Sequence, residues 1–507
     1  MSDDQTRHVN PWIVAISVMF GTFMEVLDTT VVNVSLPHIA GSMSATPEEA
    51  TWVLTSYLVA NAIILPMTGW LASQFGRKRL LIISVTGFTI SSFLCGLAPS
   101  LAMLILFRCF QGAFGGALQP LSQAVLLEAF PPQDRGKAMG FWGLGIVVAP
   151  ILGPVLGGYL TDSYNWRWVF YINIPVGIAS IVMVRLFLFD PPYLRRKAGS
   201  IDFWGMGLLT LTIASLQIML DKGQQDDWLS SGFIRTLLVL GSFGGVAFLI
   251  REFTAEHPVV NLRVLKERTF SAGIVLITVV GFVLYGSMVL LPLWLQTLLG
   301  YSAVEAGLTL APRGIGSFIA MPLVGMLVSK IDPRKIIIAG LVTTSLTLFQ
   351  FSRLSLDAGY WNFFWPQFFQ GIAMGMVFVP LTTVTMSRIP REQMGNATSI
   401  NSLMRNVGAS LGIASLTTYM SRQQQVHLNT LTTHVSPYNS MAVDMMANMP
   451  GTTQQGYARM FGMVSRQAAI LSYVDAFVLL AAIFGALIPL IFLMKRPARG
   501  GPAVAAH

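Results

Sequence analysis

Apolar runs of about 20 residues recur along almost the whole chain, with short polar stretches between them. A run of this length is what an α-helix needs to cross the hydrocarbon core of a bilayer. The pattern therefore predicts an all-α membrane protein with fourteen spanning helices. Their expected positions are 12–37, 50–73, 79–99, 101–125, 137–160, 168–190, 203–222, 233–253, 270–297, 304–329, 334–354, 362–388, 396–420 and 471–494.

Composition supports a membrane protein over a soluble one. Hydrophobic residues make up 53% of the chain and charged residues 11%, whereas a soluble domain carries about 25% charged residues. The net charge of +9 would suggest nucleic acid in a soluble protein. Here the basic residues lie in short loops, so we expect the lipid bilayer as the surroundings and no nucleic-acid partner.

Basic residues alternate between the two sides of the predicted helices. One side carries most of them, including Arg77, Lys78, Arg79, Arg135, Lys137, Lys330, Arg334, Lys335, Lys495 and Arg496. The opposite side carries few, namely Arg167, Lys222, Arg422, Arg459 and Arg466. Because cytoplasmic loops are enriched in Lys and Arg, this predicts a multi-pass membrane protein with both termini cytoplasmic.

An internal repeat divides the chain. The segment 66–79 aligns without a gap to 322–335, with a shared proline, glycine and final basic pair. Parallel repeats of six helices are typical of transporters built from two moving halves. We therefore predict a six-helix bundle at 1–202, two inserted helices at 203–253 and a second six-helix bundle at 254–507.

The connection 421–469 is unusually long and is rich in Gln, Thr, Asn and Met. Connections of that length are usually functional or disordered. We expect an external loop, in which polar residues at 421–433 can extend the preceding helix beyond the bilayer.

Small residues and prolines crowd the predicted fifth helix. Gly145, Gly153, Gly157, Gly158, Pro150 and Pro154 all fall within 145–158. Small residues at four-residue spacing let another helix approach closely in lipid, and prolines remove backbone hydrogen bonds. The stretch predicts a bent, closely packed hinge helix that seals the two halves together.

Three ionisable residues lie inside the first-half spans, where charge is costly and is by default a functional hypothesis. Glu25 and Asp28 are three residues apart on one helix, and mutual repulsion and burial favour the protonated form of at least one. Arg108 lies at a depth similar to that of Asp28, so we expect the two to be close enough to pair or to share a water if their helices pack in the same half. These three residues are the candidates for proton coupling.

Polar and aromatic residues inside other spans are candidates for substrate binding. They are Asn33, Gln111, Gln119, Trp142, Tyr285, Arg313, Phe378 and Arg405. For Arg313 and Arg405, hydrogen bonding to carbonyls at a helix break is an equally good interpretation.

Other chemistry has no support in the sequence. There is no GxxxxGK[ST] loop for nucleotide binding, no metal-ligand spacing and no nucleophile constellation. We expect no enzyme activity, no metal and no cofactor, with a proton gradient as the energy source.

Several motifs resemble those of the major facilitator superfamily, specifically the fourteen-helix drug:proton antiporters of the EmrB/QacA type. The segment 69–79, with Gly69, Gly76, Arg77, Lys78 and Arg79, resembles the superfamily's loop motif. Segments 27–37, 106–112, 145–158 and 166–175 resemble motifs of the fourteen-helix group. One departure is Ser73, which stands where the loop motif usually has an acid that helps latch the halves.

The resemblance implies a major facilitator fold of two six-helix bundles plus two central helices. It also implies proton-coupled efflux of hydrophobic or amphipathic drugs, in a pump with a periplasmic adaptor and an outer-membrane channel. The segment 421–469 is the candidate docking surface for that adaptor. A dedicated exporter of one metabolite or fatty acid, and a membrane scaffold or sensor, remain alternatives.

Overall fold

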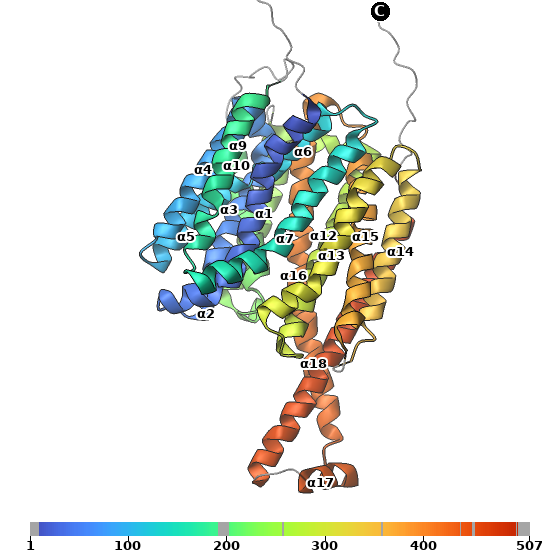
Figure 1. Cartoon of the computed structure of the whole chain (residues 1–507). Helices are drawn as coiled ribbons and strands as arrows, with labels where there is room; N and C mark the ends of the chain where they lie inside the picture. Colours follow the sequence, from blue (N-terminus) through green and yellow to red (C-terminus); the bar gives the residue numbers. More distant parts are fainter. Residues whose placement is uncertain are drawn as a thin grey trace, which may run out of the picture.

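The computed structural model describes residues 10–190, 202–255, 258–355, 358–436, 438–448, 452–492 and 494, and these contain helices but no strand. The long helices run side by side through one bundle (Figure 1). The α-helices are α1 (Pro11–Ser42), α2 (Pro47–Ala50), α3 (Trp52–Phe75), α4 (Arg77–Leu97), α5 (Leu101–Gly115), α6 (Leu118–Ala129), α7 (Arg135–Ser163), α8 (Trp168–Tyr171), α9 (Asn173–Phe187), α10 (Phe203–Lys222), α11 (Gly232–Thr254), α12 (Arg268–Thr297), α13 (Ala303–Leu327), α14 (Pro333–Phe351), α15 (Tyr360–Thr385), α16 (Met394–Thr433), α17 (Ser440–Ala447), α18 (Thr453–Ala486) and α19 (Ile488–Ile491).

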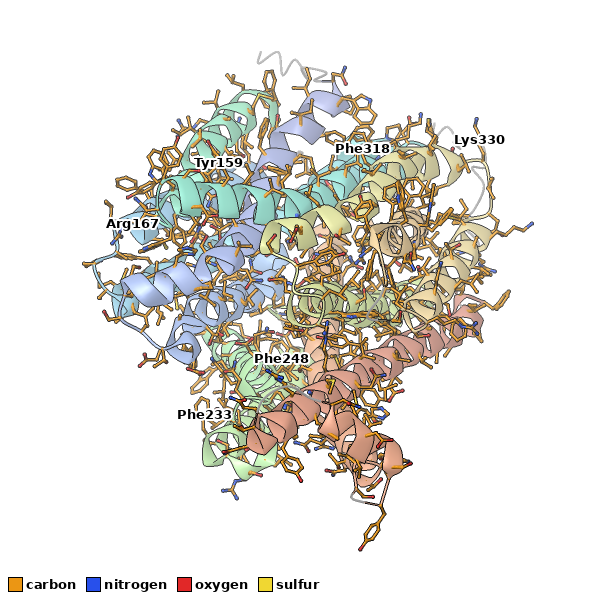
Figure 2. All side chains as sticks on the ribbon, turned by 60° about the horizontal axis from the view of Figure 1, so that its bottom comes forward. Tyr159, Arg167, Phe233, Phe248, Phe318 and Lys330 are labelled. Carbon is orange, nitrogen blue, oxygen red and sulfur yellow. The ribbon has the colours of Figure 1, made fainter. Side chains whose placement is uncertain are left out.

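Within the described residues, 12 helical segments are long and apolar enough to cross a membrane. Two further long helices, α14 and α16, pack among them, α14 against α15 and α18 and α16 against α12 and α18. Counting these two gives the fourteen predicted crossings, and the all-α prediction is confirmed. Large apolar side chains such as Phe233 and Phe318 lie exposed on the outside of the bundle (Figure 2), as expected for a lipid-facing surface.

Helix packing places early and late parts of the chain side by side. In the first part, α1 packs against α6, α7 and α9, and in the last part α12 packs against α16 and α13 against α15. Contacts of α7 with α13 and of α3 with α16 join the two parts. Helices α10 and α11 pack on each other, and α10 also contacts α3 and α16. The division of the chain at residues 202 and 253 stays a prediction.

The bundle has two distinct ends. The basic end carries Arg77 and Lys137, in the first turns of α4 and α7, and Lys330, in the connection between α13 and α14. The hairpin end is the one from which α17 projects (Figure 1). At the basic end the two parts touch backbone to backbone. A Cβ added at Gly69 would lie 2.7 Å from the Asn396 Cα, and one at Gly136 would lie 2.6 Å from the Gly325 carbonyl oxygen.

The loop motif lies at this basic end. Gly76 has a φ of 83°, a conformation that favours glycine, and it joins α3 to α4. Arg77 forms a buried ion pair with Glu128, the backbone N–H of Lys78 donates to Asp190, and Arg79 is exposed. Ser73, which replaces the usual acid, donates its hydroxyl to the Trp70 carbonyl on its own helix at 2.7 Å.

The glycine-rich part of α7 does not seal the two halves, so that prediction is wrong. A Cβ at Gly153 would lie 2.1 Å from the Thr30 Oγ1, and one at Gly157 would lie 2.9 Å from the Val31 carbonyl oxygen. Both contacts are with α1. The glycines of α7 that meet α13 are Gly136, Gly140 and Gly143, in the first part of the helix, and the glycine face turns toward α1 further along.

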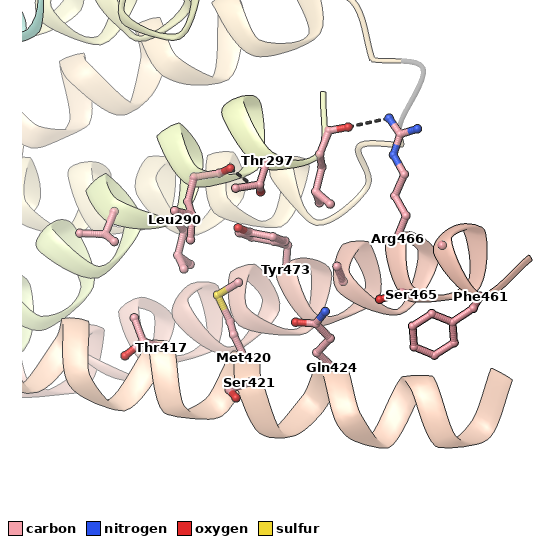
Figure 3. Close-up of a pocket in the computed structure, with 15 residues that line it drawn as sticks. Leu290, Thr297, Thr417, Met420, Ser421, Gln424, Phe461, Ser465, Arg466 and Tyr473 are labelled. Carbon is pink, nitrogen blue, oxygen red and sulfur yellow. Dashed lines mark hydrogen bonds between the residues drawn. The ribbon is translucent and has the colours of Figure 1, made fainter. Parts of the chain in front are cut away.

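The segment 421–469 is largely helical: the expected extension of the preceding helix through 421–433 is confirmed, whereas the predicted helix start at 471 is wrong. Helix α16 continues to Thr433, and α18 already begins at Thr453, where Thr452 and Gln455 form a capping box. These extensions project from the bundle with α17 at their tip (Figure 1). Near the hairpin end, α12, α16 and α18 also line an open cavity (Figure 3).

Candidate functional site

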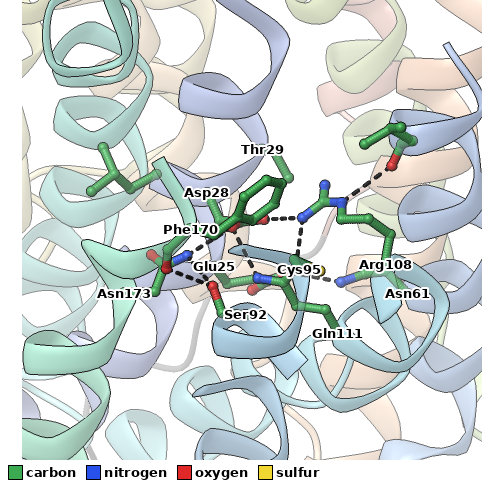
Figure 4. Close-up of polar contacts among 12 residues, drawn as sticks. Glu25, Asp28, Thr29, Asn61, Ser92, Cys95, Arg108, Gln111, Phe170 and Asn173 are labelled. Carbon is green, nitrogen blue, oxygen red and sulfur yellow. Dashed lines mark hydrogen bonds and ion pairs between the residues drawn. The ribbon is translucent and has the colours of Figure 1, made fainter. Parts of the chain in front are cut away.

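Asp28 on α1 and Arg108 on α5 form a buried ion pair (Figure 4). The Arg108 Nη1 lies 2.5 Å from the Asp28 Oδ2, and neither side chain is exposed. The Arg108 Nε donates to the Val53 carbonyl at 3.1 Å, and the guanidinium lies 4.1 Å from the centre of the Tyr57 ring. The expected contact between Asp28 and Arg108 is therefore confirmed, while its role stays a prediction.

The second carboxylate oxygen of Asp28 is held by two amides. The Gln111 Nε2 donates to the Asp28 Oδ1 at 2.9 Å, and the Asn173 Nδ2 donates to the same oxygen at 2.7 Å. Asn173 opens α9 and also donates to the Ser92 hydroxyl at 3.0 Å. Asp28 thus has the cation and the hydrogen bonds that a buried carboxylate requires.

Glu25 lies one turn earlier on α1 and has different neighbours. Its Oε1 accepts a hydrogen bond from the Asn61 Nδ2 at 2.9 Å, and its side chain is buried. Its Oε2 has no hydrogen-bond partner among the described residues, and the amide of Gln119 lies beside it. No cation forms an ion pair with Glu25 within the described part of the chain, which separates it chemically from Asp28.

A break between α5 and α6 positions Gln119. The helix stops at Gly115 and resumes at Leu118, and Pro120 has no N–H to continue the backbone hydrogen bonds. A Cβ at Gly116 would lie 2.5 Å from the Asn61 carbonyl oxygen, so α3 approaches closely at the break. Gln119 therefore stands just past a kink, next to the helix that carries Asn61.

Four of the predicted substrate residues meet between the two parts of the chain. Arg405 on α16 donates a hydrogen bond to the Gln119 side-chain oxygen. The Arg405 guanidinium lies 5.8 Å from the ring centres of both Trp142 and Phe378. Those two rings stack at 5.8 Å with an interplanar angle of 12°. We call Gln119, Trp142, Phe378 and Arg405 the central cluster.

The other four predicted substrate residues lie elsewhere. Gln111 accepts from Arg108 at 2.8 Å and belongs to the ion-pair network. Asn33 is exposed and Tyr285 is half-buried, and neither has a hydrogen bond or ring contact with the central cluster in the described residues. Arg313 is buried on α13, and no described acceptor contacts its Nε or Nη2. These two nitrogens therefore donate no hydrogen bond to backbone carbonyls at a helix break within the described residues.

Sequence reasoning did not single out Asn61, Tyr57 or Asn173. Each is uncharged, and polar amides inside an apolar run give a weaker signal than charges do. Asn173 lies within the 166–175 motif, and Asn61 is a side-chain amide inside an apolar span. No group of His, Cys, Asp and Glu that could hold a metal ion occurs among the residues that the structure describes.

Comparisons with known proteins cover nearly the whole chain. The family described as Major Facilitator Superfamily matches residues 18–413. The chain is 38% identical to the multidrug export protein EmrB of Escherichia coli, over 98% of both chains. It is 37% identical to the fatty acid resistance protein FarB of Neisseria gonorrhoeae, over 96% of this chain and 97% of that protein.

Two solved structures share the fold at low sequence identity. The human organic anion transporter MFSD10 aligns with a TM-score of 0.64 at 12% identity, over 95% of this chain and 99% of that one. A double tryptophan mutant of XylE aligns with a TM-score of 0.61 at 14% identity, over 96% of each chain.

Proposed function

The chain belongs to the major facilitator superfamily, and we propose that it exports hydrophobic and amphipathic compounds in exchange for protons. It is a multi-pass membrane protein, and its sequence is similar to that of a multidrug exporter over almost its whole length. The observation that carries the proposal is the buried group of Glu25, Asp28 and Arg108. Charges are retained inside a membrane bundle where they serve transport, and a scaffold or sensor would not need them.

We assign different tasks to the two carboxylates. Glu25 lacks an ion-pair partner in the described residues, so it can gain a proton without breaking a salt bridge. Protonation of Asp28 would cancel its attraction to Arg108 and weaken a contact between α1 and α5. Glu25 is thus the acid that exchanges protons readily, and Asp28 with Arg108 is the pair whose state biases the conformation.

The central cluster is the proposed substrate site. Two aromatic rings from different halves offer flat apolar surfaces, and Arg405 and Gln119 offer polar contacts beside them. A ligand that separates the rings would contact both halves at once. Asn33, Gln111, Tyr285 and Arg313 remain proposed contributors on other parts of the path.

One observation favours acidic amphiphiles among the substrates. Arg313 and Arg405 are buried in the second half, and neither forms an ion pair with a carboxylate among the described residues. An anionic group on the substrate would supply the missing partner. The relative FarB confers fatty acid resistance, so a dedicated exporter of fatty acids or a similar metabolite is the second candidate function.

We propose the inner membrane as the location, with both termini cytoplasmic and the hairpin end facing the periplasm. The unequal distribution of Lys and Arg supports this orientation. The projecting α16–α17–α18 hairpin is the proposed contact for a periplasmic adaptor, which would lead to an outer-membrane channel. Deleting 430–455 should abolish co-purification of such an adaptor and leave transport by the purified protein intact. Unchanged co-purification would contradict the assignment.

The two-part packing suits an exporter with two six-helix halves, 1–202 and 254–507, joined through 203–253. Helix α10 contacts α3 in one half and α16 in the other, so it can follow movements of both. The backbone contacts at the basic end suit a state closed toward the cytoplasm.

Dye transport in inside-out vesicles tests the proposed function. An imposed proton gradient should drive accumulation of a hydrophobic dye, and an uncoupler should collapse it. Accumulation that persists without any gradient would contradict proton coupling. Efflux of a long-chain fatty acid alone, with no dye transport, would favour the second candidate.

A further inference from the structure

A cavity of about 650 Å³ lies between α12, α16 and α18, near the hairpin end (Figure 3). Pockets for one small amphipathic molecule have volumes of about 300–1,000 Å³. All three walls belong to the second half of the chain, whereas the central cluster lies between the halves. The cavity is therefore separate from the proposed substrate site.

Polarity changes from one end of the cavity to the other. Val289, Leu290 and Leu293 line the end that lies within the bundle, whereas Gln424 and Arg466 lie toward the hairpin. Arg466 is the one charged residue among those that line the cavity in the described part of the chain, and no carboxylate joins it there. The chemistry fits a molecule with an apolar tail and an anionic head.

The cavity crosses the boundary that hydropathy sets for the bilayer. Apolar runs end near residue 420 on α16 and begin near 471 on α18. Thr417 and Tyr473 lie on the membrane side of those positions, and Gln424 and Arg466 lie on the other side. An occupant must therefore place its tail in the hydrocarbon region and its head at the interface, as a bilayer lipid does.

Arg466 is held in place at the mouth. Its Nη2 donates to the Leu298 carbonyl at 2.5 Å, and this carbonyl belongs to the C-terminal cap of α12. Arg466 has no ion pair among the described residues, and its side chain is exposed. A guanidinium can bind the oxygens of a phosphate through several N–H groups at once.

We propose that this cavity binds one anionic phospholipid of the leaflet at the hairpin end. One acyl chain occupies the space beside Leu290 and Leu293, and the phosphate contacts Arg466. A lipid in this position bridges α12 and the α16–α18 pair. The phospholipid would therefore brace the base of the projecting hairpin.

Lipid retention by the full-length protein tests the proposal. The purified protein is titrated with phosphatidylglycerol or with zwitterionic phosphatidylcholine, and bound lipid is counted by native mass spectrometry. The protein should bind one phosphatidylglycerol in preference to phosphatidylcholine. Arg466→Gln should weaken phosphatidylglycerol binding about tenfold or more, since it removes a charge-assisted contact. Arg422→Gln, an exposed arginine on α16 that does not line the cavity, is the matched control and should bind normally.

A second variant fills the cavity without touching charge. Gly462 lines it, and no heavy atom lies within 4 Å of a Cβ added there, so Gly462→Trp has space to fold normally. It should abolish phosphatidylglycerol retention. Equal binding of phosphatidylcholine, or full binding by both Arg466→Gln and Gly462→Trp, would overturn the proposal. Competition by an exported acidic dye would also overturn it, because the cavity would then be a substrate site.

Discussion

Arg405 on α16 donates a hydrogen bond to the side-chain oxygen of Gln119 on α6, so a cation in the last part of the chain contacts an amide in the first part. The same amide lies beside the carboxylate of Glu25. One glutamine therefore contacts the arginine of the proposed substrate site and neighbours the proposed proton site. If the Gln119 side chain moves toward Glu25, its hydrogen bond with Arg405 weakens, and if it moves toward Arg405, its interaction with the Glu25 carboxylate weakens.

A double substitution tests this link. Arg405→Gln should raise the apparent KM for dye export about tenfold, because hydrogen bonds to charged groups contribute about 1.5–3 kcal/mol. Gln119→Ala should have a smaller effect in the same direction. Because both substitutions remove the same hydrogen bond between Arg405 and Gln119, the KM of the double variant should be close to that of Arg405→Gln alone. Effects that add in full would show that the two residues act independently.

Glu25→Gln should separate coupling from binding. The amide keeps the shape of the side chain, and no salt bridge is lost in the described structure. Proton-driven accumulation of dye in vesicles should fall at least tenfold, while dye binding by fluorescence and thermal stability stay near wild type. Wild-type accumulation by the variant would remove Glu25 from the coupling mechanism.

Asp28→Asn should behave differently, because it leaves Arg108 buried without its anion. Removing one partner of a buried pair costs about 3–5 kcal/mol, so the thermal melting temperature should drop along with export. Adding Arg108→Gln should recover part of the melting temperature without restoring export. If Asp28→Asn melts like wild type and still pumps, the pair has neither a structural nor a coupling role.

The close packing of α7 on α1 can be tested with two glycines of the same stretch. Gly153→Leu drives a side chain into Thr30, and overpacking of this kind costs about 1–3 kcal/mol. Gly158→Leu is the matched control, since nothing lies within 4 Å of its added Cβ. Export and melting temperature should fall only for Gly153→Leu. Equal behaviour of the two variants would contradict the packing described for this face.

The sequence predicted what charge and hydropathy can encode. The proximity of Asp28 and Arg108 could be predicted because their depths match, because charges inside apolar spans need partners, and because the family fold that the motifs resemble packs their helices in one half. Asn61 and Asn173 could not, because an uncharged amide has no required partner and its contacts depend on how three helices meet.

Two errors have similar physical causes. A stripe of small residues such as Gly153 and Gly157 predicts close approach by a helix, but it does not specify which helix. The N-terminal extension of α18 was missed because hydropathy detects the part of a helix inside lipid, and Thr453 to Ala469 lies outside the apolar run. That part of α18 is stabilised in water by its capping box at Thr452 and by packing on α16.

Helix α16 runs without interruption for 40 residues, from the backbone contact with Gly69 through Arg405 to the projecting hairpin. At 1.5 Å per residue it is about 60 Å long. If α16 tilts by about 10° about its Asn396 end, its other end moves by about 10 Å. A conformational change caused by substrate binding near Arg405 would thus be transmitted, as a displacement of the hairpin tip, to a protein that binds the hairpin.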